Sequence, residues 1–304
     1  MKHAEIITAF ETYLLTERRV AKNTFDAYMR DLKQFFIFLD THNLLCIHIT
    51  LHDLKNYLAF LKNSGVTART MSRKISCLKT LGNYLKTRWS IRIPTEQLIL
   101  PKLEQKLPEY LTEQEVVQLL TCADQETSDA GIRNKVMLYV LYGTGIRVSE
   151  LVHITLSAVN FDEGFIVVAG KGNKERFVPL PESVIHMLKE YVQTTRVITL
   201  GRLKHSVSQS QILFPVYYDG ALKALSRQAF WNYVKDVAQR AGLSPNLSPH
   251  QLRHSLATHL LKQGANLRSL QLLLGHEQLS TVQIYTHVEV DHLRKIYDKK
   301  HPRS

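Results

Sequence analysis

Cysteine is scarce in this chain, and long apolar runs are missing. The three cysteines among the 304 residues, Cys46, Cys77 and Cys122, lie far apart and form no CxxC motif. The sequence therefore predicts neither a disulfide framework nor a cysteine zinc site. No window approaches the roughly 18 apolar residues that a membrane span needs, and the N-terminus lacks the apolar core of a signal peptide. We expect a cytoplasmic protein with no membrane partner.

Acidic residues are outnumbered: 39 lysines and arginines face 27 acids, which gives a formal charge of +12. This excess favours a polyanionic partner such as nucleic acid. It is concentrated between Arg69 and Arg92, where seven basic residues occur with no acid. A solvated helix face normally mixes both signs, so we interpret the stretch as a helix lying along DNA phosphates, although an ordinary basic surface is the alternative. The predicted phosphate contacts are Arg69, Arg73, Lys74 and Lys79.

The chain divides into two predicted domains, and 44% hydrophobic residues can supply a core for each. Apolar residues recur at helical spacing through residues 1–90, with no strand-like alternation, and predict a helical domain. The longest of its helices opens at Thr67. Pro94, Pro101 and Pro108 mark a linker over residues 91–110. The second domain covers residues 111–304.

The second domain is expected to be mostly helical with a small β-sheet. The spacing of Thr112 and Glu115 matches a capping box and predicts that a helix begins there. The segment FIVVAGKGNKERFVPL contains two β-rich runs, residues 165–168 and 176–180, joined by a turn rich in glycine and lysine. We interpret it as a β-hairpin in an otherwise helical domain.

Several polar residues stand in positions that packing alone does not explain. Considered singly, each is more often a surface or packing residue than a catalytic one. His250 and Arg253 are more informative, because a spacing of three residues directs both side chains to one side of a helix. The whole set follows one order along the chain: Arg147, Lys171, His250, Arg253, His276 and Tyr285.

Together these residues match what nucleophilic attack on a phosphodiester requires. Arg147 and Arg253 would neutralise the non-bridging oxygens with planar, permanently charged groups. A tyrosine hydroxyl with a pKa near 10 must be activated at neutral pH, and His250 is placed to accept the proton of Tyr285. The leaving 5′ oxygen must be protonated, and Lys171 in the hairpin turn suits a general acid. His276 would donate a further hydrogen bond to the phosphate.

The motifs GTGIRVSEL, HQLRHSLATHLL and LLGHEQLSTVQIYTHV, with GKGNKER, resemble the motif blocks of the tyrosine recombinase (phage integrase) family. The resemblance is closest to the bacterial Xer site-specific recombinases and covers nearly the whole chain. By this resemblance the six residues correspond to the six catalytic positions, and Glu150 matches a supporting acidic position. Leu256, Val282 and the length of residues 196–211 depart from the usual pattern. These departures concern the subfamily and partner rather than the chemistry.

The resemblance implies an N-terminal four-helix SAM-like core-binding domain and an α+β catalytic domain with a C-terminal tail helix, which close as a C-shaped clamp on duplex DNA. It implies cleavage through a 3′-phosphotyrosyl intermediate without metal, ATP or other cofactor. It further implies a tetramer on two DNA sites, often with a paralogous Xer recombinase and a septal DNA translocase. We therefore expect a nucleoid-associated enzyme that resolves chromosome or plasmid dimers at cell division.

Four other functions are compatible with parts of the sequence. An integrase of a plasmid, phage or transposon would share every catalytic residue, and a type IB topoisomerase would share the chemistry without pairing two DNA sites. A non-catalytic DNA-binding protein would need no tyrosine in this context. A metal-dependent enzyme could use His250 and His254, but no HExxH motif or carboxylate cluster accompanies them.

Overall fold

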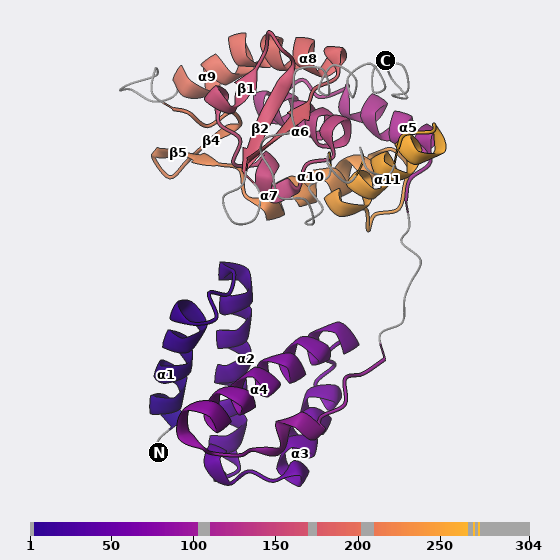
Figure 1. The fold of residues 1–304 in the computed structure, drawn as a ribbon. Helices are drawn as coiled ribbons and strands as arrows, with labels where there is room; N and C mark the ends of the chain where they lie inside the picture. Colours follow the sequence, from indigo (N-terminus) through magenta and orange to yellow (C-terminus); the bar gives the residue numbers. More distant parts are fainter. Residues whose placement is uncertain are drawn as a thin grey trace. The chain divides into compact units, whose positions relative to one another are not determined.

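The computed structural model describes residues 3–102, 110–169, 175–201 and 210–266, together with residues 270 and 273. The chain separates into two compact units, Met1–Lys106 and Leu107–Ser304 (Figure 1). None of the helices in these ranges combines the length and the hydrophobicity of a membrane-spanning segment.

Within residues 3–102, the first unit is built from helices alone, as the sequence predicts. Its four α-helices are α1 (His3–Thr16), α2 (Lys22–Thr41), α3 (Leu51–Asn63) and α4 (Ala68–Trp89), accompanied by the short 3₁₀ helices η1 (Cys46–His48) and η2 (Pro94–Gln97). Helix α2 packs against both α1 and α4 (Figure 1). Helix α4 begins after Thr67, whose side chain accepts a hydrogen bond from the backbone N–H of Thr70. This cap confirms the predicted start of the longest helix of the unit.

The first unit extends further along the chain than the predicted boundary at residue 90. Ile93 and Leu98 are buried in its hydrophobic core, and η2 packs against α3 and α4. The prolines indicated an extended linker, but the apolar residues between them anchor this stretch to the helices. Residues 91–98 therefore belong to the first core rather than to the linker.

Helix α6 (Asp129–Thr144) lies at the centre of the second unit. It contacts five other helices of the unit (Figure 1). These are α5 (Glu113–Ala123), α8 (Glu182–Gln193), α9 (Thr195–Gly201), α10 (Arg227–Arg240) and α11 (Pro249–Lys262). Helix α5 begins with the predicted capping box, because Thr112 and Glu115 each bind the other's backbone N–H. Helix α6 lacks a polar face and carries buried residues around most of its surface, as a central helix requires.

A small antiparallel sheet interrupts these helices. Strands β1 (Val159–Asn160), β2 (Phe165–Ala169) and β3 (Glu175–Pro179) lie in the order β1-β2-β3. Val168 lies opposite Arg176, and Ala169 lies opposite Glu175. The predicted β-hairpin is thus confirmed. A second hairpin is formed by β4 (Pro215–Tyr218) and β5 (Ala221–Ala224).

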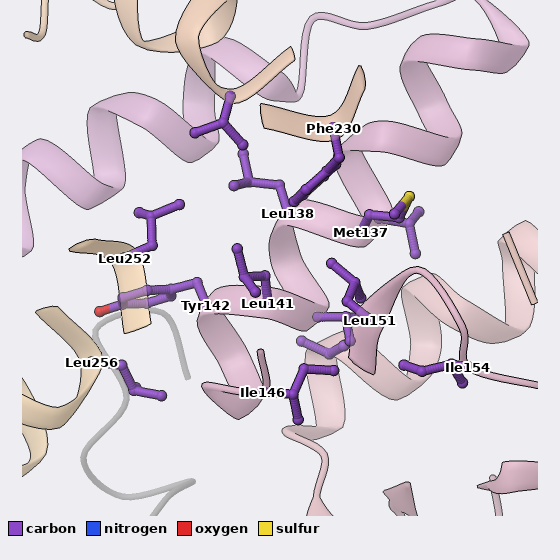
Figure 2. Close-up of a cluster of buried hydrophobic side chains, with 14 of the residues drawn as sticks. Met137, Leu138, Leu141, Tyr142, Ile146, Leu151, Ile154, Phe230, Leu252 and Leu256 are labelled. Carbon is purple, nitrogen blue, oxygen red and sulfur yellow. The ribbon is translucent and has the colours of Figure 1, made fainter. Parts of the chain in front are cut away.

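The hydrophobic core of the second unit positions the two segments that carry the candidate site. Figure 2 shows side chains of α6, among them Leu138, Leu141 and Tyr142, beside Leu252 and Leu256 of α11. Ile146 and Leu151 belong to the same core and are fully buried. The turn after α6 and the helix α11 therefore pack on a common apolar base, and their polar residues are presented from it.

Candidate active site

The turn between α6 and α7 (Val148–Leu151) presents Arg147. Gly145 ends α6 with a φ of 62°, a left-handed conformation, and donates its N–H to the carbonyl of Leu141 over 2.9 Å. Glycine reaches this conformation without the strain that a Cβ would add. Ile146 then turns into the core, and Arg147 emerges with its side chain 44% exposed. The sequence GTGIR therefore brings an arginine to the surface at a fixed point.

Glu150 holds this arginine at two atoms. Its Oε2 accepts the backbone N–H of Arg147 over 2.7 Å, and its Oε1 accepts Nη1 of Arg147 over 2.9 Å. The Glu150 side chain is only 8% exposed. Glu150 thus contacts both the backbone and the side chain of Arg147.

Arg176 on β3 is a second partner of Glu150 and is not among the residues predicted for the site. Its Nη1 and Nη2 donate to Oε1 and Oε2 of Glu150 over 3.0 and 2.9 Å. Alternation along the strand places Arg176 on the same face as the buried Val178. An arginine on the apolar face of a strand requires a buried acidic partner, and this signal was available in the sequence.

Helix α11 brings His250 and Arg253 to the same region. Ser248 caps the helix by accepting the N–H of Gln251, and Pro249 occupies its first turn, where proline is well tolerated. Arg253 is buried, and its Nη1 donates to the carbonyl of Gly145 over 2.6 Å. This bond links α11 directly to the turn that presents Arg147.

The charges of these groups shift one another's titration. Burial, followed by the positive charges of Arg147 and Arg176, lowers the pKa of Arg253 to about 10, so the guanidinium stays charged at neutral pH. Burial would raise the pKa of Glu150, but hydrogen bonds from Arg176 and Arg147 outweigh it and hold that pKa below its usual value. The cluster therefore contains three cations and one carboxylate, and its positive excess suits a phosphate.

His250 lies at the edge of this cluster. Partial desolvation of its ring, followed by the electrostatic effects of Arg253, His254 and Arg147, lowers its pKa below 6.5. The imidazole is consequently neutral at pH 7 and able to accept a proton. The structure thus brings together Arg147, Glu150, His250 and Arg253 of the predicted catalytic set. The remaining predicted residues, Lys171, His276 and Tyr285, lie outside the described residues, as does the predicted C-terminal tail helix.

An open hollow of about 610 Å³ adjoins the cluster. Glu150 forms part of its lining, and Ala169 and Glu175, the last and first residues of β2 and β3, lie at it as well. The predicted acid Lys171 falls in the chain between those two residues. The base of the hairpin therefore stands next to the carboxylate that holds Arg147. The remaining lining residues are Ser149, His153, Ile154, Thr155, Ser157, Ala158, Val167 and Val168.

The segment that enters the second unit is fastened to α11. Ser255 accepts the backbone N–H of Leu111 over 2.8 Å, and Nε2 of His259 lies 2.8 Å from the carbonyl of the same residue. Nδ1 of His259 lies 3.0 Å from the hydroxyl of Tyr142 on α6. These buried contacts fix α11 against both α6 and the start of the unit.

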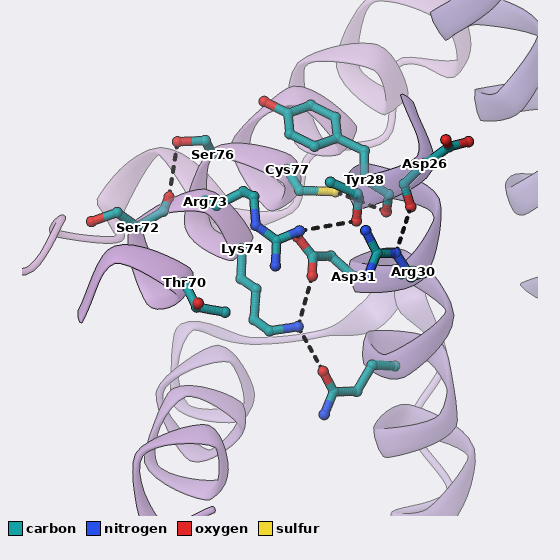
Figure 3. A network of polar contacts seen from close by, with 12 residues as sticks. Asp26, Tyr28, Arg30, Asp31, Thr70, Ser72, Arg73, Lys74, Ser76 and Cys77 are labelled. Atoms are coloured by element: carbon teal, nitrogen blue, oxygen red, sulfur yellow. Dashed lines mark hydrogen bonds and ion pairs between the residues drawn. The ribbon is translucent and has the colours of Figure 1, made fainter. Parts of the chain in front are cut away.

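In the first unit, the predicted DNA contacts on α4 are not equivalent. Arg69 is exposed, while Arg73 and Lys79 are half-buried. Lys74 is buried, and its Nζ donates to Asp31 over 2.8 Å and to Gln34 over 2.6 Å. Figure 3 shows Lys74 and Arg73 both directed at Asp31, and the Arg73–Asp31 distance is 2.8 Å. The placement of Lys74 on the phosphate-binding surface is therefore corrected, because its charge is neutralised between α2 and α4.

Both units match models of known protein families. Residues 109–292 match the model described as the phage integrase family, and residues 7–88 match the phage integrase N-terminal SAM-like domain. A protein named tyrosine recombinase XerD from Staphylococcus saprophyticus is 39% identical over 303 residues, which cover 98% of this chain and 99% of that protein. A protein of the same name from Staphylococcus aureus is 38% identical to this chain over 303 residues.

Solved structures share the fold at lower identity. A XerH site-specific recombinase bound to difH substrate in a pre-cleavage complex has a TM-score of 0.67 and 22% identity, with 98% of this chain and 81% of that chain covered. A lambda integrase dimer bound to a core site has a TM-score of 0.65 and 19% identity, with coverages of 93% and 100%. The two-part family match and the near-complete alignment to the staphylococcal proteins establish that this chain belongs to the tyrosine recombinase (phage integrase) family and is a site-specific recombinase of the Xer type.

Proposed function

We propose that this recombinase cuts and rejoins DNA through a 3′-phosphotyrosyl intermediate on Tyr285. The observation that carries the proposal is the convergence of Arg147, held by Glu150, and Arg253, held by the Gly145 carbonyl, near His250. Two guanidinium groups next to a neutral imidazole provide charge for the scissile phosphate and a base for a phenol. His276 would add a hydrogen bond to the phosphate.

In the proposed reaction, His250 accepts the proton of Tyr285 while the phenol oxygen attacks phosphorus. The bond between phosphorus and the 5′ oxygen breaks, and Lys171 donates the proton that leaves this oxygen as a hydroxyl. The phosphodiester energy is conserved in the phosphotyrosyl bond, so the step consumes no nucleotide. A 5′ hydroxyl from a partner duplex reverses the same steps and completes strand exchange.

We further propose that the two units form a clamp on duplex DNA, that four protomers act on two recombination sites, and that the tail after Tyr285 docks on a neighbouring protomer. The biological reaction proposed is the resolution of chromosome or plasmid dimers at cell division. The near-full-length likeness to proteins named tyrosine recombinase XerD supports this role. A second, related recombinase and a septal DNA translocase are the proposed partners.

The chemistry is tested by trapping covalent protein–DNA adducts on nicked DNA, from which the short fragment beyond the cleavage site diffuses away. Wild-type protein should retain a 5′-labelled strand through Tyr285 and release a fragment with a 5′ hydroxyl. Tyr285→Phe should bind the same DNA and form no adduct. An adduct that persists in Tyr285→Phe would assign the nucleophile to another residue. Sequencing adduct junctions recovered from the native host identifies the site to use.

The biological role has a separate test. Deletion of the gene in its host should raise the fraction of dimeric chromosomes or plasmids. Only a copy of the gene with an intact Tyr285 codon should return this fraction to the wild-type level. Unchanged monomer and dimer fractions, with adducts mapping to the ends of a mobile element, would contradict dimer resolution but leave the chemistry intact.

A further inference from the structure

Arg176 occupies an unusual place for a charged residue. It lies on β3 with its side chain 9% exposed, on the face that also carries Val178. Its Nη1 and Nη2 both bind Glu150, while its buried Nε has no hydrogen-bond partner within the described part of the chain. A buried ion pair seldom stabilises a fold more than apolar packing of similar volume would. The burial of this pair is therefore not accounted for by stability alone.

The four hydrogen bonds to Glu150 from Arg147 and Arg176 are arranged symmetrically. Oε1 accepts Nη1 of Arg147 and Nη1 of Arg176, at 2.9 and 3.0 Å. Oε2 accepts the backbone N–H of Arg147 and Nη2 of Arg176, at 2.7 and 2.9 Å. The planar fork of Arg176 thus fixes the plane of the carboxylate. That plane in turn determines where both the backbone and the guanidinium of Arg147 lie.

Without Arg176, the carboxylate would keep its bonds to Arg147 but lose the partner that sets its orientation. Glu150 could then rotate together with Arg147, whose side chain is 44% exposed. A misplacement of about 1 Å in a group that contacts reacting atoms can reduce a rate about 100-fold.

We propose that Arg176 is a positioning residue for recombination, which acts through Glu150 to orient Arg147 on the scissile phosphate. The inference rests on the proposed function, in which Arg147 neutralises a non-bridging oxygen. It assigns to β3 a task separate from that of the hairpin turn, where the proposed general acid Lys171 lies.

The test compares Arg176→Gln and Arg176→Lys with wild type in single-turnover adduct formation. Two substrates are used: the natural phosphodiester, and a methylphosphonate that lacks one anionic oxygen at the cleaved position. On the phosphodiester, Arg176→Gln should react about 10- to 100-fold more slowly with unchanged DNA affinity. On the methylphosphonate, Arg176→Gln should be only a few-fold slower than wild type, and Arg147→Ala should behave in the same way. The reason is that the methylphosphonate lacks one of the negative charges that Arg147 neutralises. Arg176→Lys should be intermediate, since a point charge cannot form the two-pronged contact.

Arg133→Gln is the matched control, because it also removes a buried arginine from the second unit. Arg133 bonds to the carbonyl of Pro215 and to Asn134 rather than to Glu150. Its variant should show the same ratio of the two substrate rates as wild type. Thermal denaturation of each variant confirms that the compared proteins are folded.

Two results would overturn the proposal. One is an equal defect of Arg176→Gln on both substrates, which would indicate general loss of packing. The other is restoration of Arg176→Gln by a 5′-bridging phosphorothioate, whose thiolate leaves without protonation; this would place the effect on the Lys171 hairpin. Absence of any adduct with wild-type protein would instead contradict the proposed function itself. Glu150→Gln combined with Arg176→Gln should be no slower than the slower single variant, since both act through one carboxylate.

Discussion

Arg253 on α11 donates from Nη1 to the carbonyl oxygen of Gly145 over 2.6 Å, so the two candidate phosphate ligands, Arg253 and Arg147, are fixed relative to each other by the backbone of one turn. Arg253 is thus held by a carbonyl, and Arg147 is held by Glu150. The two arginines reach the site from segments more than 100 residues apart, since Arg253 lies 108 residues after Gly145 in the chain.

The first prediction concerns this bond. Arg253→Lys should slow adduct formation by about 10²- to 10³-fold, the usual cost of losing one donor to a developing oxyanion. A lysine cannot both reach the Gly145 carbonyl and offer a planar pair of donors to phosphate. Single-turnover trapping measures the rate, and filter binding measures the affinity, which should change little. A rate within threefold of wild type would show that the fork geometry of Arg253 is dispensable.

The second prediction is a pH dependence with a defined sign. Because the pKa of His250 lies below 6.5, the cleavage rate should be independent of this group at pH 7 and fall as the pH drops through the lowered pKa. Arg147→Ala removes a nearby positive charge, so it should raise the pKa of His250 toward 6.5. Titration of the His250 ring by NMR in both proteins checks the direction. A lower pKa in Arg147→Ala would contradict the charge arrangement described above.

The same shift affects stability. The folded protein binds a proton at His250 less readily than the unfolded chain does, and the pKa of His259 is lowered as well, mainly by burial. The unfolded state therefore binds more protons, and the free energy of unfolding should decrease as the pH falls below about 6.5. His259→Gln should reduce this decrease, and chemical denaturation at several pH values would measure it.

The third prediction separates the basic residues of α4. A plot of log affinity against log salt concentration has a negative slope for a DNA-binding protein. Arg69→Ala should make this slope shallower by about 0.9, the value for one lost phosphate contact. Lys74→Ala should leave the slope unchanged, because Lys74 is already neutralised by Asp31. It should instead lower the free energy of unfolding by roughly 2–3 kcal/mol, less than the approximately 3–5 for an isolated buried ion pair, since Arg73 still contacts Asp31. A reduced slope for Lys74→Ala would show that Lys74 leaves Asp31 when DNA binds.

The fourth prediction concerns the hairpin turn. Lys171→Ala should lose cleavage of ordinary DNA but recover it on a 5′-bridging phosphorothioate, because a thiolate leaves without a proton. Arg253→Lys serves as the control, since its defect lies at the non-bridging oxygens and should persist on this substrate. Failure of the sulfur substrate to rescue Lys171→Ala would assign the acid to another residue.

Local patterns in the sequence predicted most of the fold. Capping at Thr67 and Thr112, helical periodicity, and β-rich runs on both sides of a glycine turn depend on neighbours along the chain, so they are visible in one sequence. The short core segment around Ile93 and Leu98 was missed because its prolines suggested an extended chain. Its apolar residues take effect only when α3 and α4 are present to receive them.

The two charged residues that were misjudged or overlooked have distant partners. Lys74 lies one turn before Leu78 on the apolar stripe of α4, so its burial was readable, but Asp31 lies 43 residues away on another helix. Arg176 likewise lies 26 residues from Glu150. Periodicity shows that a side chain faces inward, whereas the identity of its partner depends on how separate elements pack.

The contacts of Leu111 with Ser255 and His259 have a mechanical consequence. Leu111 is among the first described residues of the second unit, and both of its polar backbone atoms are held by the helix that carries His250 and Arg253. Any shift of α11 relative to Leu111 would break both of these buried contacts. The helix that carries the proposed base His250 is therefore coupled to the first turns of its own unit.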